Sequence, residues 1–164
     1  MGRRIHTSIS IAILLVTTLS AFAEKASKQS TPADAHFRQL IQQLYEAWSD
    51  LEPAKAAKFY AKDPNLTFFD IAPMKYTGWQ EYATGVPTAF SAYKSGKFVV
   101  GDDVQVHQHG NLTWADCTWT ADLTKKDGSH ENAAGRYTVV WERRGSDWLI
   151  VHEHMSVPLS APAK

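Results

Sequence analysis

Histidine and serine side chains recur near the end of the chain at the spacing that a β-strand places on one face. His152, His154 and Ser156 lie two residues apart in a β-rich segment, and every second residue of a strand points the same way. A neutral imidazole beside a hydroxyl can pass on a proton or orient a water molecule. The same pair also fits a buried histidine that is hydrogen-bonded for structural reasons, so both interpretations stay open.

A second histidine pair, His107 and His109, has the same spacing. Four imidazoles from the two pairs could bind zinc. Two predicted strands separate the pairs, however, and His109 adjoins a turn. We therefore expect no metal site.

Asp70 follows two phenylalanines. In apolar surroundings its carboxyl would have a raised pKa and could act as a base at the mouth of a cavity. An aspartate at the end of a strand also often caps a turn. Arg136 fits a cross-strand ion pair or an anion ligand. Cys117, the only cysteine, has no neighbouring base, and we do not expect it to be a nucleophile.

Hydrophobic periodicity predicts the elements that would position these residues. Thr31 and Pro32 are typical of a helix start, and the apolar residues after them recur at helical spacing as far as Trp48. Shorter helices are predicted at about 53–60 and 78–93, with short strands at 66–71 and 74–77. Four longer strands follow, each separated from the next by a turn dipeptide, at about 97–109, 111–124, 130–144 and 147–157.

Helices followed by an antiparallel meander indicate an α+β fold. A strongly twisted sheet of about six strands curls into a cone, and N-terminal helices packed on its concave face would enclose a cavity. The predicted domain spans residues 32–158. We expect mainly aromatic side chains to line the cavity and contact its ligand: Tyr45, Trp48, Tyr76, Trp79, Trp119, Arg136 and His152.

The N-terminus has the pattern of a secretory signal peptide. Arg3 and Arg4 precede an apolar run over 9–19, which the small-residue site Ala21-Phe22-Ala23 follows. We predict a signal peptide over 1–23, a flexible leader over 24–31 and a C-terminal tail over 159–164. The protein is then exported and is periplasmic or secreted.

Loss of the signal peptide removes two of the 17 basic residues and leaves 15 basic and 17 acidic side chains in 141 residues. This length suits one domain, and the net charge argues against a nucleic-acid partner. No apolar run approaches the roughly 20 residues that a membrane span requires. A single cysteine allows no intramolecular disulfide, so packing or dimerisation must stabilise the fold.

The sequence resembles the SnoaL-like branch of the nuclear transport factor 2 superfamily over about residues 35–158. The segments that carry the resemblance are 63–70 (DPNLTFFD), 76–79 (YTGW), 135–138 (GRYT), 141–144 (WERR) and 148–158 (WLIVHEHMSVP). The resemblance implies a cone-shaped α+β fold with a cavity, and a homodimer formed through the outer face of the sheet. The superfamily includes isomerases, cyclases, dehydratases and proteins that only bind or assemble.

Two groups in this superfamily look similar in detail. One is the association domain of calcium/calmodulin-dependent protein kinase; its pocket arginines correspond here to Val139 and Met155. The other is the iota-class carbonic anhydrases, which include metal-free members. Thr67, His154 and Ser156 match their functional positions, whereas the expected tyrosine position falls near Gly85, one helical turn after Tyr82.

These observations together predict an exported homodimer with an aromatic small-molecule cavity and no cofactor. If it is an enzyme, we expect proton-transfer or hydration chemistry, including carbon dioxide hydration as one alternative. His154 would be the acid/base, Ser156 and Thr67 would position substrate or water, and Tyr82 or Tyr76 would donate a hydrogen bond. Asp70 is the alternative base, as in the ketosteroid isomerase relatives, and a binding or assembly module without turnover is the competing class.

Overall fold

The computed structural model describes residues 31–159. The predicted signal peptide, nearly all of the leader and all but the first residue of the tail lie outside these residues. The described helices are α1 (Pro32–Trp48), α2 (Pro53–Ala56), the 3-10 helix η1 (Ala57–Phe59) and α3 (Gly78–Ala89). None of them is long and apolar enough to cross a membrane.

Helix α1 begins at the residue that the sequence indicates. Thr31 is its N-cap, and its hydroxyl accepts a hydrogen bond from the Asp34 amide while the Asp34 carboxylate accepts one from the Thr31 amide. This reciprocal arrangement is a capping box. The buried face of the helix carries the apolar stripe predicted from the sequence: Phe37, Ile41, Leu44 and Tyr45.

Seven strands form one curved sheet, and its α+β architecture confirms the predicted fold class. The strands are β1 (Thr67–Phe69), β2 (Tyr76–Thr77), β3 (Tyr93–Val100), β4 (Gln105–His109), β5 (Leu112–Lys125), β6 (His130–Arg144) and β7 (Asp147–Ser156). Their order is β2-β1-β7-β6-β5-β3, with β4 also paired to β5. All pairs are antiparallel except β1 with β7.

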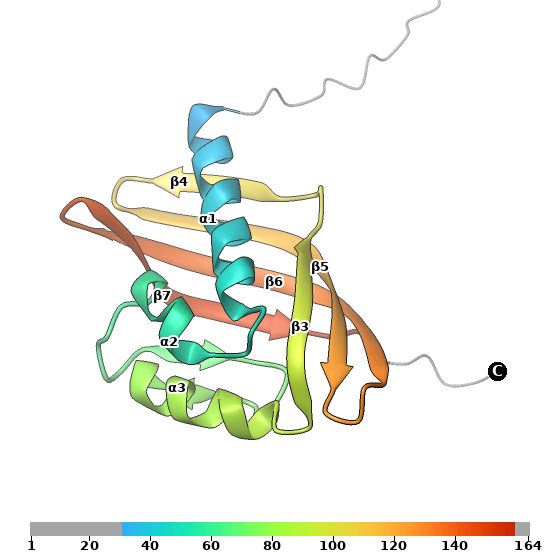
Figure 1. The fold of residues 1–164 in the computed structure, drawn as a ribbon. Coiled ribbons are helices and arrows are strands. Elements are labelled where there is room, and N and C mark those ends of the chain that lie inside the picture. The colour runs from blue at the N-terminus through green and yellow to red at the C-terminus, as the bar shows by residue number, and fades with distance from the viewer. Residues whose placement is uncertain (1–30, 160–164) are drawn as a thin grey trace, which may run out of the picture.

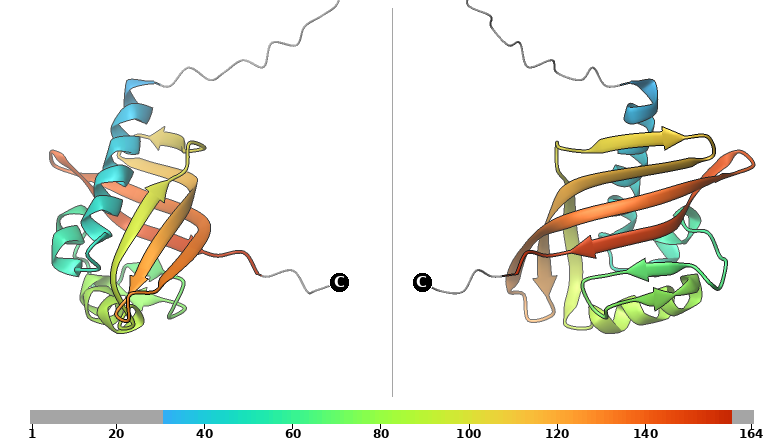
Figure 2. Two further views of the ribbon diagram at one scale, coloured as in Figure 1. Left: turned by 45° about the vertical axis from the view of Figure 1, so that its right-hand side comes forward. Right: turned by 180° about the vertical axis from the view of Figure 1, so that it is seen from behind.

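The helices lie on one side of the sheet. Helix α1 crosses the inner face of β5 and β6 (Figure 1). Helix α2 lies beside the C-terminal end of α1, and α3 lies below α2 in this view. Viewed from behind, β5, β6 and β7 present an outer face that no helix of residues 31–159 covers (Figure 2). The core therefore lies between α1 and the inner face, where the Phe37 ring centroid is 5.1 Å from the rings of both Trp141 and Trp148.

The single strand predicted over about 97–109 is wrong: the segment forms two strands that pair with different parts of β5. Strand β3 pairs with the second half of β5, and β4 pairs with its first half. The connection is fixed by Asp103, whose carboxylate accepts hydrogen bonds from the amide and the hydroxyl of Thr118 at 2.9 and 3.0 Å. Helix α3 also ends earlier than predicted, at Ala89, two residues after Pro87.

Candidate functional site

A β-bulge in β7 decides which side chains face the helices. Val140 pairs with His152 but the next residue, Trp141, pairs with Ile150, so Val151 is an extra residue in β7. An extra residue reverses the inside–outside alternation beyond it. Ile150 and Glu153 are both buried as a result, and His154 is exposed. His152, His154 and Ser156, which the sequence places together on one strand face as site residues, are therefore on the face opposite to Ile150 and Glu153.

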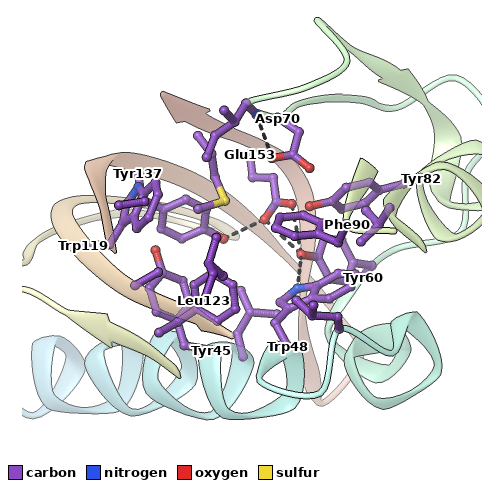
Figure 3. A pocket seen from close by; sticks show the side chains of 18 residues that line it. Tyr45, Trp48, Tyr60, Asp70, Tyr82, Phe90, Trp119, Leu123, Tyr137 and Glu153 are labelled. Carbon is purple, nitrogen blue, oxygen red and sulfur yellow. Dashed lines mark hydrogen bonds between the residues drawn. The ribbon is translucent and has the colours of Figure 1, made fainter. Parts of the chain in front are cut away.

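An aromatic cavity lies between α1, α3 and the inner face of the sheet (Figure 3). The volume of this cavity is about 60 Å³. The cavity therefore suits a small ligand. Its aromatic lining residues are Tyr45, Trp48, Tyr60, Tyr82, Phe90, Phe98, Trp119 and Tyr137.

Glu153 is the more buried of the two carboxylic acids that line the cavity, with 2% of its surface exposed. The Tyr137 hydroxyl donates to its Oε2 at 2.7 Å, and the Tyr60 hydroxyl lies 3.0 Å from each carboxyl oxygen. Trp48 Nε1 donates in turn to the Tyr60 hydroxyl at 3.1 Å. The dashed lines of Figure 3 follow this chain from β7 to α1.

Burial is the main cause of the altered acidity of Glu153. Desolvation raises the pKa of its carboxyl to about 7, and the hydrogen bonds from Tyr82, Tyr137 and Tyr60 oppose that rise. The negative charge of Asp70 adds to the increase. Glu153 therefore exchanges its proton near neutral pH.

Asp70, the alternative base of the sequence analysis, forms part of the cavity wall. Desolvation raises the pKa of its carboxyl to about 6, although its Oδ1 accepts a hydrogen bond from the Ile71 amide at 2.7 Å. Asp70 also borders a groove on the outer surface, together with Ile71 and Met155. It is thus the acidic group that lies between the cavity and solvent.

Tyr45 contributes a hydroxyl with no protein partner. Its side chain is 3% exposed and lines the cavity, and its hydroxyl has no hydrogen-bond partner among the described residues. Figure 3 shows this hydroxyl directed away from α1, toward Tyr137 and Trp119. Burial raises the pKa of Tyr45 above its ordinary value, so the hydroxyl keeps its proton.

The structure brings some of the predicted residues together in this cavity. Its lining includes Tyr45, Trp48, Asp70, Tyr82 and Trp119.

Tyr76 and Trp79 lie behind that lining. Their ring centroids are 4.9 and 5.8 Å from the ring of Tyr82. Arg136 is exposed and does not line the cavity.

The other predicted catalytic residues lie on the outer side of the sheet. His154 and Ser156 border the surface groove rather than the cavity. His152 Nδ1 is 2.7 Å from the Thr67 carbonyl oxygen in the neighbouring strand, so this histidine has a structural hydrogen bond. No observation in residues 31–159 favours the carbon dioxide hydration that the resemblance implies.

Glu153, Tyr60 and Tyr137 are site residues that the sequence analysis missed. One signal was available: Glu153 interrupts the alternating apolar series Val151, Met155 and Val157 near the end of the domain. A carboxyl at such a position needs partners that donate hydrogen bonds, and tyrosines at buried positions of neighbouring elements can provide them. Within residues 31–159, no three His, Cys, Asp or Glu side chains lie close enough to hold a metal ion.

Solved structures resemble the whole described domain. An NTF2-like superfamily protein from Salmonella enterica serovar Typhimurium is 21% identical with a TM-score of 0.65, over 77% of this chain and 94% of that one. The association domain of Caenorhabditis elegans CaMKII is 14% identical with a TM-score of 0.61, over 76% of this chain and 95% of that one. At these identities the likeness establishes the fold alone.

A third structure, an NTF2-like protein of unknown function from Pseudomonas putida, is 25% identical with a TM-score of 0.61, over 79% of this chain and 89% of that one. No curated protein matches the sequence significantly. A family model for the SnoaL-like domain matches residues 37–160, which is most of the chain. The curved sheet, the helices on its inner face and this match together show that the chain belongs to the SnoaL-like domain family.

Proposed function

We propose that the protein binds a small, mostly apolar molecule in the aromatic cavity and transfers a proton on it without a cofactor. Asp70 is the proton acceptor in this proposal. The observation that carries it is the position of the Asp70 carboxyl, which is in the cavity wall and has a pKa of about 6. Titratable groups with shifted pKa values in a concave site are typical of acid–base catalysis.

The shifted pKa makes Asp70 a stronger base than an ordinary aspartate. A carboxyl group with a pKa of about 6 is mostly ionised at pH 7. Once protonated, it holds its proton more tightly than a solvated aspartate does. General bases are most effective when their pKa lies near the working pH. Removal of a proton from a carbon beside a carbonyl group is the reaction that such a base supports.

Glu153 has a different part in this site. Its carboxyl oxygens are surrounded by tyrosine hydroxyls, which leave little access for a substrate proton. Glu153 instead makes one end of the cavity polar and orders the rings of Tyr60 and Tyr137 around the ligand. It is a positioning residue in this proposal.

Isotope exchange tests the proposal without knowledge of the natural substrate. The protein is incubated in D2O with acetone, cyclohexanone and aminoacetone, and NMR follows the loss of the protons next to each carbonyl group. We expect exchange of at least one ketone to exceed the buffer rate. No exchange of any ketone, combined with a small molecule retained in native mass spectra, would favour a binding module without turnover.

We also propose that the protein is exported and forms a homodimer through its outer sheet face. Leu112 and Trp114, two residues apart on one face of β5, are each 42% exposed, and large apolar side chains exposed next to one another are typical of interfaces. The full chain should be expressed in a bacterium and recovered from the periplasm or medium. We expect mass spectrometry to give the mass of a mature chain that begins at Glu24. Light scattering should give twice that mass. A monomer at micromolar concentration would contradict the dimer, and an uncleaved cytoplasmic chain would contradict export.

A further inference from the structure

The cavity contains acidic groups but no basic group. Asp70 and Glu153 line it, whereas no lysine, arginine or histidine does. In the described part of the chain, neither carboxyl lies within ion-pair distance of a basic side chain. A buried carboxylate without a counter-charge is costly. An anionic ligand would increase this cost, and a cationic ligand would reduce it.

The aromatic lining has the composition that binds organic cations. Three of the rings, those of Trp48, Tyr60 and Tyr82, lie near one another beside Glu153, with centroid separations of 5.6 to 6.3 Å. The faces of aromatic rings carry partial negative charge and attract alkylammonium groups. Such groups also have an apolar surface, so they lose less hydration on entering the cavity than a metal ion would.

The unpartnered hydroxyl of Tyr45 is an independent sign of a ligand. A buried hydroxyl without a hydrogen bond destabilises the folded protein, and Tyr45 lines the same cavity as the two carboxyls. A phenylalanine would fill this place without that cost. The oxygen of Tyr45 can accept a hydrogen bond from an N–H group of a bound ligand.

We infer that the cavity binds a small alkylammonium ion, whose positive charge lies between the aromatic rings and the carboxyl groups of Asp70 and Glu153. The inference rests on the proposal that this cavity is the ligand site, but it does not depend on proton transfer. The cavity volume of about 60 Å³ suits a compact ligand. Tert-butylammonium, with five non-hydrogen atoms, is a compact probe of this class.

Tert-butanol is the matched neutral probe because it has the same shape and the same number of non-hydrogen atoms. Each probe is titrated into the protein at pH 7.5, and NMR follows the indole N–H signals of Trp48 and Trp119, which line the cavity. We expect tert-butylammonium to bind at least tenfold more tightly than tert-butanol. Equal affinities, stronger binding of the alcohol, or no binding of either probe would overturn the inference.

A variant identifies the source of the preference. Glu153→Gln removes one negative charge with almost no change of shape, and we expect it to lower the affinity for tert-butylammonium severalfold while tert-butanol binding stays the same. Glu46→Gln, at an exposed position of α1, should leave both affinities unchanged. An unchanged affinity for the cation in Glu153→Gln would also overturn the inference. The exchange of acetone and cyclohexanone, which are neutral, tests proton transfer separately, so failure of one proposal does not imply failure of the other.

Discussion

Glu153→Gln is expected to stabilise the protein by about 1–3 kcal/mol above pH 7, although it changes a fully hydrogen-bonded buried side chain. Desolvation raises the pKa of Glu153 from 4.5 to about 7, and each pKa unit corresponds to about 1.4 kcal/mol. The ionised carboxylate therefore costs roughly 3 kcal/mol of folding free energy at high pH. A glutamine avoids this cost, and its amide still pairs with some of the tyrosine hydroxyls.

The same shift predicts the direction of the pH dependence. Between pH 4.5 and about 7 the folded protein holds the Glu153 proton, whereas the unfolded chain has released it. Stability therefore falls as pH rises through this window and changes no further above it. The raised pKa of Asp70 acts in the same direction between about pH 4 and 6.

Urea unfolding of the wild type and Glu153→Gln from pH 4.5 to 8.5 measures this effect. We expect the wild type to lose stability between pH 4.5 and about 7 and to change little above that pH. The variant should lose much less. Glu153→Ala should be less stable by about 3–5 kcal/mol because it leaves a void and several unpaired hydroxyls. Glu46→Gln, on the surface, should change stability by no more than about 0.5 kcal/mol. Parallel pH curves for wild type and Glu153→Gln would show that Glu153 has an ordinary pKa.

Asp70→Asn is expected to reduce the proton-transfer rate by about 10²- to 10⁴-fold, the usual contribution of a general base. Asparagine has nearly the same shape, and its side-chain oxygen can still accept the hydrogen bond from the Ile71 amide. The change removes the basic group with no loss of packing. We therefore expect stability to stay the same or to increase above pH 6.

The pH profile distinguishes loss of a base from a general disturbance of the cavity. The wild-type exchange rate should rise with pH and reach a plateau, with its midpoint at about 6, the pKa of Asp70. The residual rate of Asp70→Asn should show no such midpoint. The same midpoint in the variant would assign the titration to another group.

Much of the fold could be predicted because its signals are local. The capping residues and apolar stripe of α1 lie within 18 residues of sequence. The turns that join β4 to β5, β5 to β6 and β6 to β7 were recognisable from Gly110, Gly128 and Gly145, whose positive φ angles suit glycine. The division of β3 from β4 was missed because it depends on the distant contact between Asp103 and Thr118.

The site was harder to predict because one residue controls which face points inward. The bulge at Val151 leaves no clear trace in a strand that is apolar on both faces. It moves His154 to the outer surface and Glu153 into the cavity. Asp70 directly follows the short strand β1 and lines the cavity, and no bulge in β1 alters its placement.

The most direct test of the account compares two variants in the ketone exchange assay. Asp70 lines the aromatic cavity, and His154 lies in the outer groove. We expect Asp70→Asn to lose exchange activity and His154→Ala to retain it, with both proteins folded. Loss of activity in His154→Ala together with full activity in Asp70→Asn would contradict this expectation and would place the reaction in the outer groove.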